Sequence, residues 1–174
     1  MEPSALASAD VLDFENRPSR RLIILGKLCS NCLFDMYAKK YKLTTNAWEI
    51  LALVGRYEPI FPHKVGELTT MESDRVSRAV EALVGRGLVV RNNDIADRRR
   101  VILGLTAKGH KVYEEIDAVR RTLDADMLDI LSETEQAELG RLLGKLETYS
   151  RAAYTGKDAW KKILAKRGTA ERPG

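Results

Sequence analysis

Apolar side chains recur every three or four positions over most of this chain, the spacing that lines up one face of an α-helix. The first such stretch begins after Pro18 and Ser19 and runs to about Lys40, with apolar or cysteine side chains at positions 22, 25, 28, 32 and 36. The same spacing predicts further helices over residues 43–57, 63–70, 71–87, 106–130, 132–153 and 157–167. The sequence therefore predicts a mainly α-helical protein.

Local signals indicate where several of these helices begin and end. Thr44 or Thr45 is expected to cap the second helix and Thr106 the helix over 106–130, because a hydroxyl oxygen accepts a backbone N–H of the first turn. Ser132 and Glu135 have the spacing of a capping box. The helix over 71–87 is expected to end at its glycines and to bury one apolar stripe, which consists of Val76, Val80, Leu83 and Val84.

A β-hairpin is predicted between the helices over 71–87 and 106–130. The runs "LVVR" (88–91) and "VILGL" (101–105) are rich in β-branched residues, and the polar stretch 92–100 between them reads as a long hairpin tip. Two short helices, a tight connection and a hairpin make a winged helix-turn-helix. A helix with an arginine-bearing outer face fits the major groove of DNA, and arginines at a hairpin tip can reach phosphates or the minor groove.

Composition narrows the class of protein further. The chain has 174 residues, of which 44% are hydrophobic and 31% charged, as in a soluble globular domain. No apolar run approaches the roughly 20 residues of a membrane span, and the N-terminus lacks a signal pattern, so we expect a cytoplasmic protein. The net charge of +4 lies in the tail, so only a local surplus supports DNA binding: seven basic and four acidic residues between 74 and 100.

The stretch "DIADRRRVILGLTAKG" (94–109) carries a more specific signal. Its residues Asp97, Arg99, Leu105, Thr106 and Gly109 match the D-x-R-x5-L-T-x-x-G signature of the MarR family of transcriptional regulators. The segment "SDRVSRAVEALVGRGLVVR" also resembles the recognition helix and wing of that family. The resemblance covers residues 19–153, with a departure at "KVGELTT", where Gly66 and two threonines replace a more helix-favouring sequence.

This resemblance implies a set of DNA-binding residues. Arg99 matches the arginine that enters the minor groove, and Asp97 matches the acid that steadies the wing by pairing with a basic side chain, here Arg78. The expected DNA-binding residues are therefore Ser73, Arg75, Ser77, Arg78, Asp97, Arg98 and Arg99. Arg100 begins the returning strand and is expected to point elsewhere.

The resemblance also implies a homodimer on a pseudo-palindromic DNA operator. The helices over 19–40 and 106–153 would form the dimer, residues 44–105 the DNA-binding lobe, residues 1–18 a flexible arm and residues 154–174 a basic tail. Family members bind small aromatic ligands between the dimer helices and this lobe. A repressor released by an aromatic acid or its CoA thioester, in control of aromatic-compound breakdown, follows as an expectation, with Ser30, Met36, Trp48 and His63 as candidate pocket residues.

Cys29 and Cys32 spell C-x-x-C and leave an alternative open. Structural zinc requires four ligands, and His63 and His110 lie in distant segments, so no metal site is expected. Both cysteines fall in mid-helix and are expected to be buried thiols. The alternative is a thiol-based redox-sensing repressor. An enzyme is not expected, because the chain has no glycine-rich phosphate loop, nucleophile elbow or clustered carboxylates, and no cofactor is implied.

Overall fold

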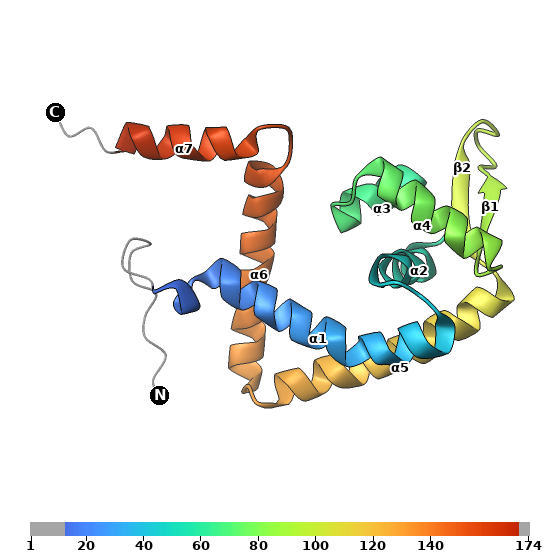
Figure 1. Ribbon diagram of the computed structural model, residues 1–174, viewed down its shortest axis with the longest axis horizontal. Coiled ribbons are helices and arrows are strands. Elements are labelled where there is room, and N and C mark those ends of the chain that lie inside the picture. Colours follow the sequence, from blue (N-terminus) through green and yellow to red (C-terminus); the bar gives the residue numbers. More distant parts are fainter. Residues whose placement is uncertain (1–12, 171–174) are drawn as a thin grey trace. The chain divides into compact units, whose positions relative to one another are not determined.

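The computed structural model describes the backbone of residues 13–170 and the side chains of residues 13–165. Most of the arm predicted for residues 1–18 therefore lies outside the described residues. The elements, in chain order, are η1 (Phe14–Asn16), α1 (Pro18–Tyr41), α2 (Thr45–Tyr57), α3 (Pro62–Thr69), α4 (Ser73–Gly85), β1 (Val89–Asn93), β2 (Val101–Leu105), α5 (Ala107–Asp129), α6 (Glu133–Tyr154) and α7 (Ala159–Ala170) (Figure 1). The contacts divide the chain into two units, with the boundary after Asp124, in the last two turns of α5.

The predicted helix caps are confirmed. The Thr44 hydroxyl accepts the backbone N–H of Ala47 at 3.2 Å, and the Thr106 hydroxyl accepts that of Gly109 at 2.9 Å. Ser132 and Glu135 form a complete capping box at the start of α6. Each hydroxyl satisfies one of the N–H groups that the first turn of a helix leaves without a backbone partner.

The core of the first unit lies among α2, α4, the hairpin and the facing parts of α1 and α5. Trp48, Leu51 and Val54 of α2 are buried, and so are Val76, Val80 and Leu83 of α4, as the spacing of the α4 stripe predicted. Val84, the fourth member of the predicted stripe, is only half-buried. The opposite face of α4 is left exposed because these helical positions bury one stripe only.

A tight turn joins α4 to the hairpin. Gly87 adopts a left-handed φ of +65°, with its N–H bonded to the carbonyl of Val84 at 2.9 Å, while the Leu88 N–H bonds to the Leu83 carbonyl at 3.0 Å. This pair of bonds is the Schellman arrangement, which favours glycine because other side chains are strained at positive φ. The sequence prediction that glycine ends this helix is confirmed.

The hairpin pairs β1 with β2 in antiparallel register, from Val89 opposite Leu105 to Asn93 opposite Val101. Ile60, in the connection from α2 to α3, adds a short bridge on the other side of β2. Its N–H donates to the Leu103 carbonyl at 3.1 Å, and its carbonyl accepts the Leu103 N–H at 2.8 Å. Strand β2 is therefore held from both sides, by β1 and by Ile60.

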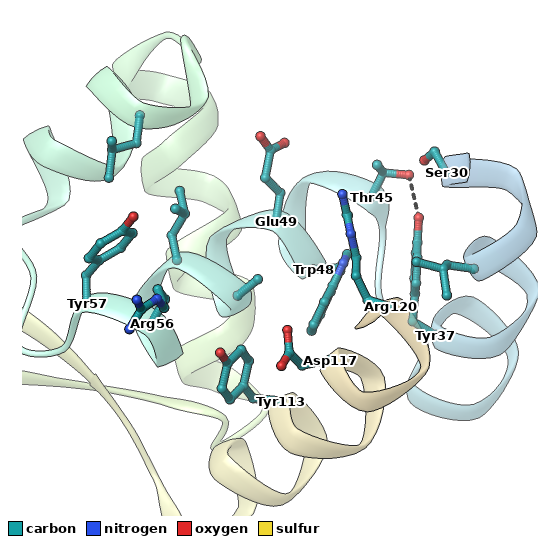
Figure 2. A pocket seen from close by; sticks show the side chains of 14 residues that line it. Ser30, Tyr37, Thr45, Trp48, Glu49, Arg56, Tyr57, Tyr113, Asp117 and Arg120 are labelled. Carbon is teal, nitrogen blue, oxygen red and sulfur yellow. Dashed lines mark hydrogen bonds between the residues drawn. The ribbon is translucent and has the colours of Figure 1, made fainter. Parts of the chain in front are cut away.

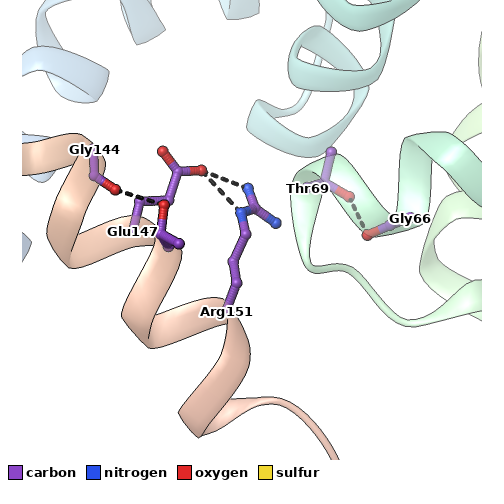
Figure 3. A network of polar contacts seen from close by, with 6 residues as sticks. Gly66, Thr69, Gly144, Glu147 and Arg151 are labelled. Carbon is purple, nitrogen blue, oxygen red and sulfur yellow. Dashed lines mark hydrogen bonds and ion pairs between the residues drawn. The ribbon is translucent and has the colours of Figure 1, made fainter.

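Helix α3 forms despite the glycine and threonines that depart from the family pattern. The Thr69 hydroxyl donates to the Val65 carbonyl at 2.8 Å and lies 3.4 Å from the Gly66 carbonyl (Figure 3). It also accepts the Met71 N–H at 3.2 Å. Side-chain bonds of this kind compete with the helix ladder, so Thr69 ends α3 one residue before the left-handed Thr70.

The second unit contains the end of α5 together with α6 and α7. Helix α6 has 22 residues, none of which is buried within the chain, and it carries ion pairs such as that of Arg151 with Glu147 at 2.8 Å (Figure 3). Among the described residues, no helix has the length and apolar character needed to cross a bilayer. Two short helices followed by an antiparallel hairpin, within a mainly helical chain, form the predicted winged helix-turn-helix.

Candidate functional site

The exposed face of α4 carries the polar residues that the sequence singled out. Ser73, Arg75, Ser77 and Arg78 are all exposed, because the buried stripe of α4 occupies the opposite face. Within the described part of the chain, the Arg75 side chain has no hydrogen-bond or carboxylate partner, whereas Arg78 donates from Nε to the Asp74 carbonyl at 3.3 Å. Arg75 is thus free to contact a ligand outside the chain.

The wing tip is ordered by two aspartates. The Asp94 carboxylate accepts the Ala96 N–H at 3.0 Å, and the Asp97 carboxylate accepts the Arg99 N–H at 3.0 Å. The Asp94 N–H also donates to the Arg100 carbonyl at 2.9 Å. Aspartates are common in turns because they hydrogen-bond the backbone two residues ahead. These bonds give the tip a defined shape.

The predicted partner of Asp97 differs from the observed one. The pairing of Asp97 with Arg78 is not found among the described residues, since Asp97 binds the backbone of Arg99 and Arg78 binds its own helix. The side chains of Arg98 and Arg99 are exposed and have no protein partner in the described chain. Asp97 steadies the wing through the backbone, which leaves these two guanidinium groups to project from the tip.

Arg100 points to a different place, as the sequence led us to expect. Its guanidinium carbon lies 4.0 Å from the centre of the Phe61 ring, within the range of a cation–π contact. The Phe61 ring is itself stacked with the His63 ring, at 5.5 Å between centres and an interplanar angle of 22°. The end of the wing is thereby joined to the first residues of α3.

The base of the wing is anchored by Glu58 at the end of α2. One carboxylate oxygen accepts the Leu105 N–H at 2.6 Å, and the other lies 3.1 Å from Nε2 of His110 on α5. A single side chain therefore links α2, β2 and α5. Sequence reasoning did not identify this role, because the three elements are distant along the chain.

A cavity of about 480 Å³ opens between α1, α2 and α5 in the first unit (Figure 2). Aromatic rings form much of its wall: Trp48 is stacked against Tyr37 at 6.3 Å and against Tyr113 at 6.5 Å between ring centres. Gly55 makes the position of Tyr113 possible, because a Cβ at residue 55 would lie 2.8 Å from the ring. The remaining lining residues are Ser30, Leu33, Thr45, Glu49, Ala52, Leu53, Arg56, Tyr57, Leu68, Asp117 and Arg120.

Charges of both signs surround this cavity. Arg120 lies 3.7 Å from Asp124, and Asp117 pairs with Arg121 at 3.0 Å, whereas Arg56 has no carboxylate partner among the described residues. Burial raises the pKa of the Glu49 carboxyl, and it also raises the pKa of the Tyr113 hydroxyl together with the nearby Asp117 charge. The cavity thus combines flat aromatic walls with cations that can receive an anionic group.

The four candidate pocket residues from the sequence fall in different places. Ser30 and Trp48 line the large cavity, whereas Met36 is packed against the core and does not line the cavity. His63 borders a separate cavity of about 290 Å³ between α3 and α4, together with Ser73 and Ser77. The sequence analysis missed Arg56, Tyr113 and Arg120, because only the fold brings α2 and α5 together.

The two cysteines are more accessible than expected. Cys32 is exposed and Cys29 is half-buried, with no disulfide between them. The prediction that both thiols are buried is therefore wrong for the chain by itself, because the part of α1 that carries them packs only Leu33 and Tyr37 fully into the core. No group of His, Cys, Asp or Glu side chains in the described residues could hold a metal ion.

Known proteins resemble this chain in both sequence and fold. The family model for the MarR family matches residues 41–100, which run from the end of α1 to the wing tip. A helix-turn-helix-type transcriptional regulator of Bacillus cereus is 26% identical over 122 residues, which cover 70% of this chain and 81% of that protein.

Solved structures of regulators have the same fold. A MarR-family transcriptional regulator from Listeria monocytogenes, solved with a 26-mer DNA, has a TM-score of 0.71 at 18% identity and covers 87% of this chain and 95% of its own. BpsR of Bordetella bronchiseptica, whose DNA binding is regulated by 6-hydroxynicotinic acid, has a TM-score of 0.65 at 22% identity, over 78% of this chain and 96% of its own. With the wing signature and the fold described above, these findings show that the chain resembles the DNA-binding transcriptional regulators of the MarR family.

Proposed function

We propose that this protein is a homodimeric repressor that binds a pseudo-palindromic operator and is released by a small aromatic acid. The observation that carries the proposal is the ordered wing tip, from which Arg98 and Arg99 project without a protein partner, beside the exposed face of α4. Unpaired guanidinium groups on a shaped support suit phosphates and groove edges, because they form charge-assisted bonds in a fixed direction.

The proposed roles follow from the positions of the side chains. Arg99 enters the minor groove, Arg98 contacts phosphate, and Asp97 holds the tip through the Arg99 N–H. The exposed face of α4 lies in the major groove and contributes Ser73, Arg75, Ser77 and Arg78. The DNA-binding lobe would then consist of residues 44–105, the dimer helices of residues 19–40 and 106–153, and the basic tail of residues 154–174.

The test begins with DNA selected by the wild-type protein from a random duplex library. Arg99→Ala should weaken binding to the selected duplex by about 1–3 kcal/mol and reduce the salt dependence of binding. Arg121→Ala is the matched control, since it removes the same charge from α5, where Arg121 pairs with Asp117. The proposal fails if selection yields no consensus, or if Arg99→Ala binds as tightly as the Arg121→Ala control.

Exposed apolar side chains support the homodimer. Helix α6 buries none of its residues within the chain, although Leu142, Leu143, Leu146 and Tyr149 are large apolar side chains along it. Helix α1 likewise exposes Leu22, Ile23, Leu25 and Leu28. Apolar surface of this extent on two helices is typical of a symmetric interface between copies. Sedimentation should give a dimer that Leu146→Glu dissociates and the neighbouring control Glu147→Gln leaves intact.

The large cavity supports an aromatic effector. Its volume of about 480 Å³ lies within the usual range of small-molecule sites, and it holds a one-ring acid more readily than a whole CoA thioester. The rings of Trp48 and Tyr113 would stack on the ligand ring, and Arg56 or Arg120 would receive the carboxylate. The regulation of BpsR by 6-hydroxynicotinic acid is consistent with this chemistry.

Thermal-shift screening with aromatic acids and their CoA thioesters tests this part. A ligand of the native state must raise the melting temperature, and the same compound should release the protein from DNA. Arg56→Gln or Arg120→Gln should reduce the shift, whereas Arg121→Gln, outside the cavity wall, should retain it. If both cavity variants respond as the wild type does, the effector binds elsewhere.

A redox-sensing repressor is the second candidate. The exposure of Cys32, three residues from Cys29 on α1, favours it, since an accessible thiol can be oxidised.

We place the protein in the cytoplasm and do not expect an enzyme, because members of this family are transcriptional regulators. Strong retention on heparin that falls steeply with salt would distinguish a DNA-binding protein from an enzyme.

A further inference from the structure

The segment between α2 and α3 connects the wing to the helix-turn-helix. Ile60 exchanges two backbone hydrogen bonds with Leu103 in β2, and the next residue, Phe61, stands at the N-cap of α3. The Phe61 carbonyl accepts the N–H groups of Lys64 and Val65 at 3.0 and 3.2 Å. Residues 60 and 61 thus belong to the wing and to α3 at the same time.

Phe61 is an unusual residue for this position. Ser, Thr, Asp and Asn are preferred at an N-cap, because their side chains accept a backbone N–H of the first turn, and Phe61 makes no such bond. Its ring is only half-buried and is not among the buried side chains of the core. Neither helix capping nor core packing accounts for an aromatic side chain here.

The contacts of the ring supply another explanation. The Arg100 guanidinium at the end of the wing tip lies 4.0 Å from the ring centre, and the His63 ring of α3 stacks on it at 5.5 Å. Arg100 is also fixed through its backbone, since its N–H donates to the Asp97 carbonyl and its carbonyl accepts the Asp94 N–H, both at 2.9 Å. The side chain at the N-cap of α3 therefore holds the residue that closes the wing-tip turn.

From this geometry we infer that Phe61 is a positioning residue for DNA binding, which fixes the wing tip relative to α3 and α4 through Arg100. The inference rests on the proposed role of Arg99 as a DNA contact. Arg99 is the neighbour of Arg100, so a stack that restrains Arg100 restrains the direction in which Arg99 leaves the tip. A wing that is ordered before binding loses less conformational freedom when it meets DNA.

The test is a double-mutant cycle on affinity for the duplex selected by the wild-type protein. Phe61→Leu keeps an apolar side chain but removes the π face, and should weaken binding about two- to fivefold, the size of an exposed cation–π contact. Phe61→Tyr keeps the π face and should restore affinity to within about twofold. The factor by which Arg99→Ala weakens DNA binding should be about two- to fivefold smaller in the Phe61→Leu background. An Arg99 side chain that is no longer positioned contributes less to binding, so its removal costs less affinity.

The chain offers a matched control in η1, just before α1. Phe14 lies outside the wing and contacts two arginines, with the guanidinium carbons of Arg20 and Arg17 4.6 and 5.6 Å from its ring centre. Phe14→Leu removes the same kind of stack and should leave DNA affinity and the Arg99→Ala loss unchanged.

A second cycle keeps the inference testable if Phe61→Leu lowers the melting temperature. Arg100→Gln breaks the stack from the wing side, and the Phe61→Leu, Arg100→Gln double variant should bind no more weakly than the weaker single variant. The inference is overturned if Phe61→Leu binds DNA as tightly as the wild type does. It is also overturned if the fold-loss in affinity of the Phe61→Leu, Arg99→Ala double variant equals the product of the two single fold-losses. An Arg99→Ala variant with unchanged affinity would instead refute the proposed DNA contact, whatever Phe61 does.

Discussion

Gly109, the last residue of the wing signature, is the position where we expect the largest effect of a single methyl group. A Cβ built on Gly109 would lie 2.0 Å from the backbone carbonyl oxygen of Leu88, far closer than any real carbon–oxygen contact. That carbonyl accepts the Thr106 N–H at 3.1 Å, so α5 must begin directly against the strand before the wing. Gly109→Ala should therefore separate α5 from the base of the hairpin.

The magnitude follows from three contributions. Overpacking against the Leu88 backbone and the Leu105 Cβ lies near the upper end of its usual range, about 3 kcal/mol. Loss of the Thr106–Leu88 hydrogen bond adds about 1 kcal/mol, and the better helix propensity of alanine offsets about 1 kcal/mol. The expected loss in the free energy of unfolding is about 3 kcal/mol, or a melting temperature about 6–12 °C lower for a chain of this size.

Circular-dichroism melts at one fixed protein concentration measure this effect. Gly66→Ala is the control, because a Cβ at this helical position meets the Met71 carbonyl at an ordinary 3.5 Å. It should leave the melting temperature unchanged or raise it slightly. If Gly109→Ala has the same melting temperature as Gly66→Ala, the close approach of Gly109 to Leu88 does not exist in solution and the reasoning is refuted.

Three further predictions concern the operator, the cysteines and the pH dependence of stability. Footprinting should reveal two half-sites about one helical turn (roughly 10 bp) apart, and a single half-site bound by a monomer would contradict the dimer. A Cys29→Ser, Cys32→Ser double variant should still bind the operator and still be released by the effector; release of only the wild type by diamide would instead favour the redox sensor. Hydrogen bonds from Lys40 and Tyr41 lower the pKa of the Glu115 carboxyl below its usual value of 4.5. Their contribution to the stability of the folded protein is therefore complete above pH 4.5 and is lost as the pH falls through the lowered pKa. Urea unfolding should therefore find Glu115→Gln less stable than the wild type at pH 7, with the difference closing in acid; a constant difference at all pH values would contradict this.

The local structure of this chain could be predicted from sequence because its determinants are close together along the chain. The caps at Thr44, Thr106 and Ser132 each join residues three positions apart, and the glycine at 87 ends α4 through bonds within one turn. The wing signature lies within 13 consecutive residues, from Asp97 to Gly109. Helix order, the hairpin and the resemblance to the MarR family could all be inferred from such short-range patterns.

The partners of side chains that meet across the fold were decided by the tertiary structure. Tyr113 enters the cavity wall because Gly55, 58 positions earlier, leaves room for its ring, and neither residue signals the other locally. Phe61 and Arg100 meet because β2 pairs with Ile60, the neighbour of Phe61. This contact accounts for an aromatic residue at an N-cap, where a small polar residue is usual.

The accessibility of Cys32 also separates what local sequence determines from what tertiary packing decides. Periodicity predicts which residues share a helix face, but a face is buried only where another element covers it. The sequence by itself thus determined the elements of this protein and their order, because hydrogen bonds within a turn depend on neighbours. The tertiary structure alone decided which side chains meet in the cavity and at the wing, because those contacts depend on the packing of distant elements.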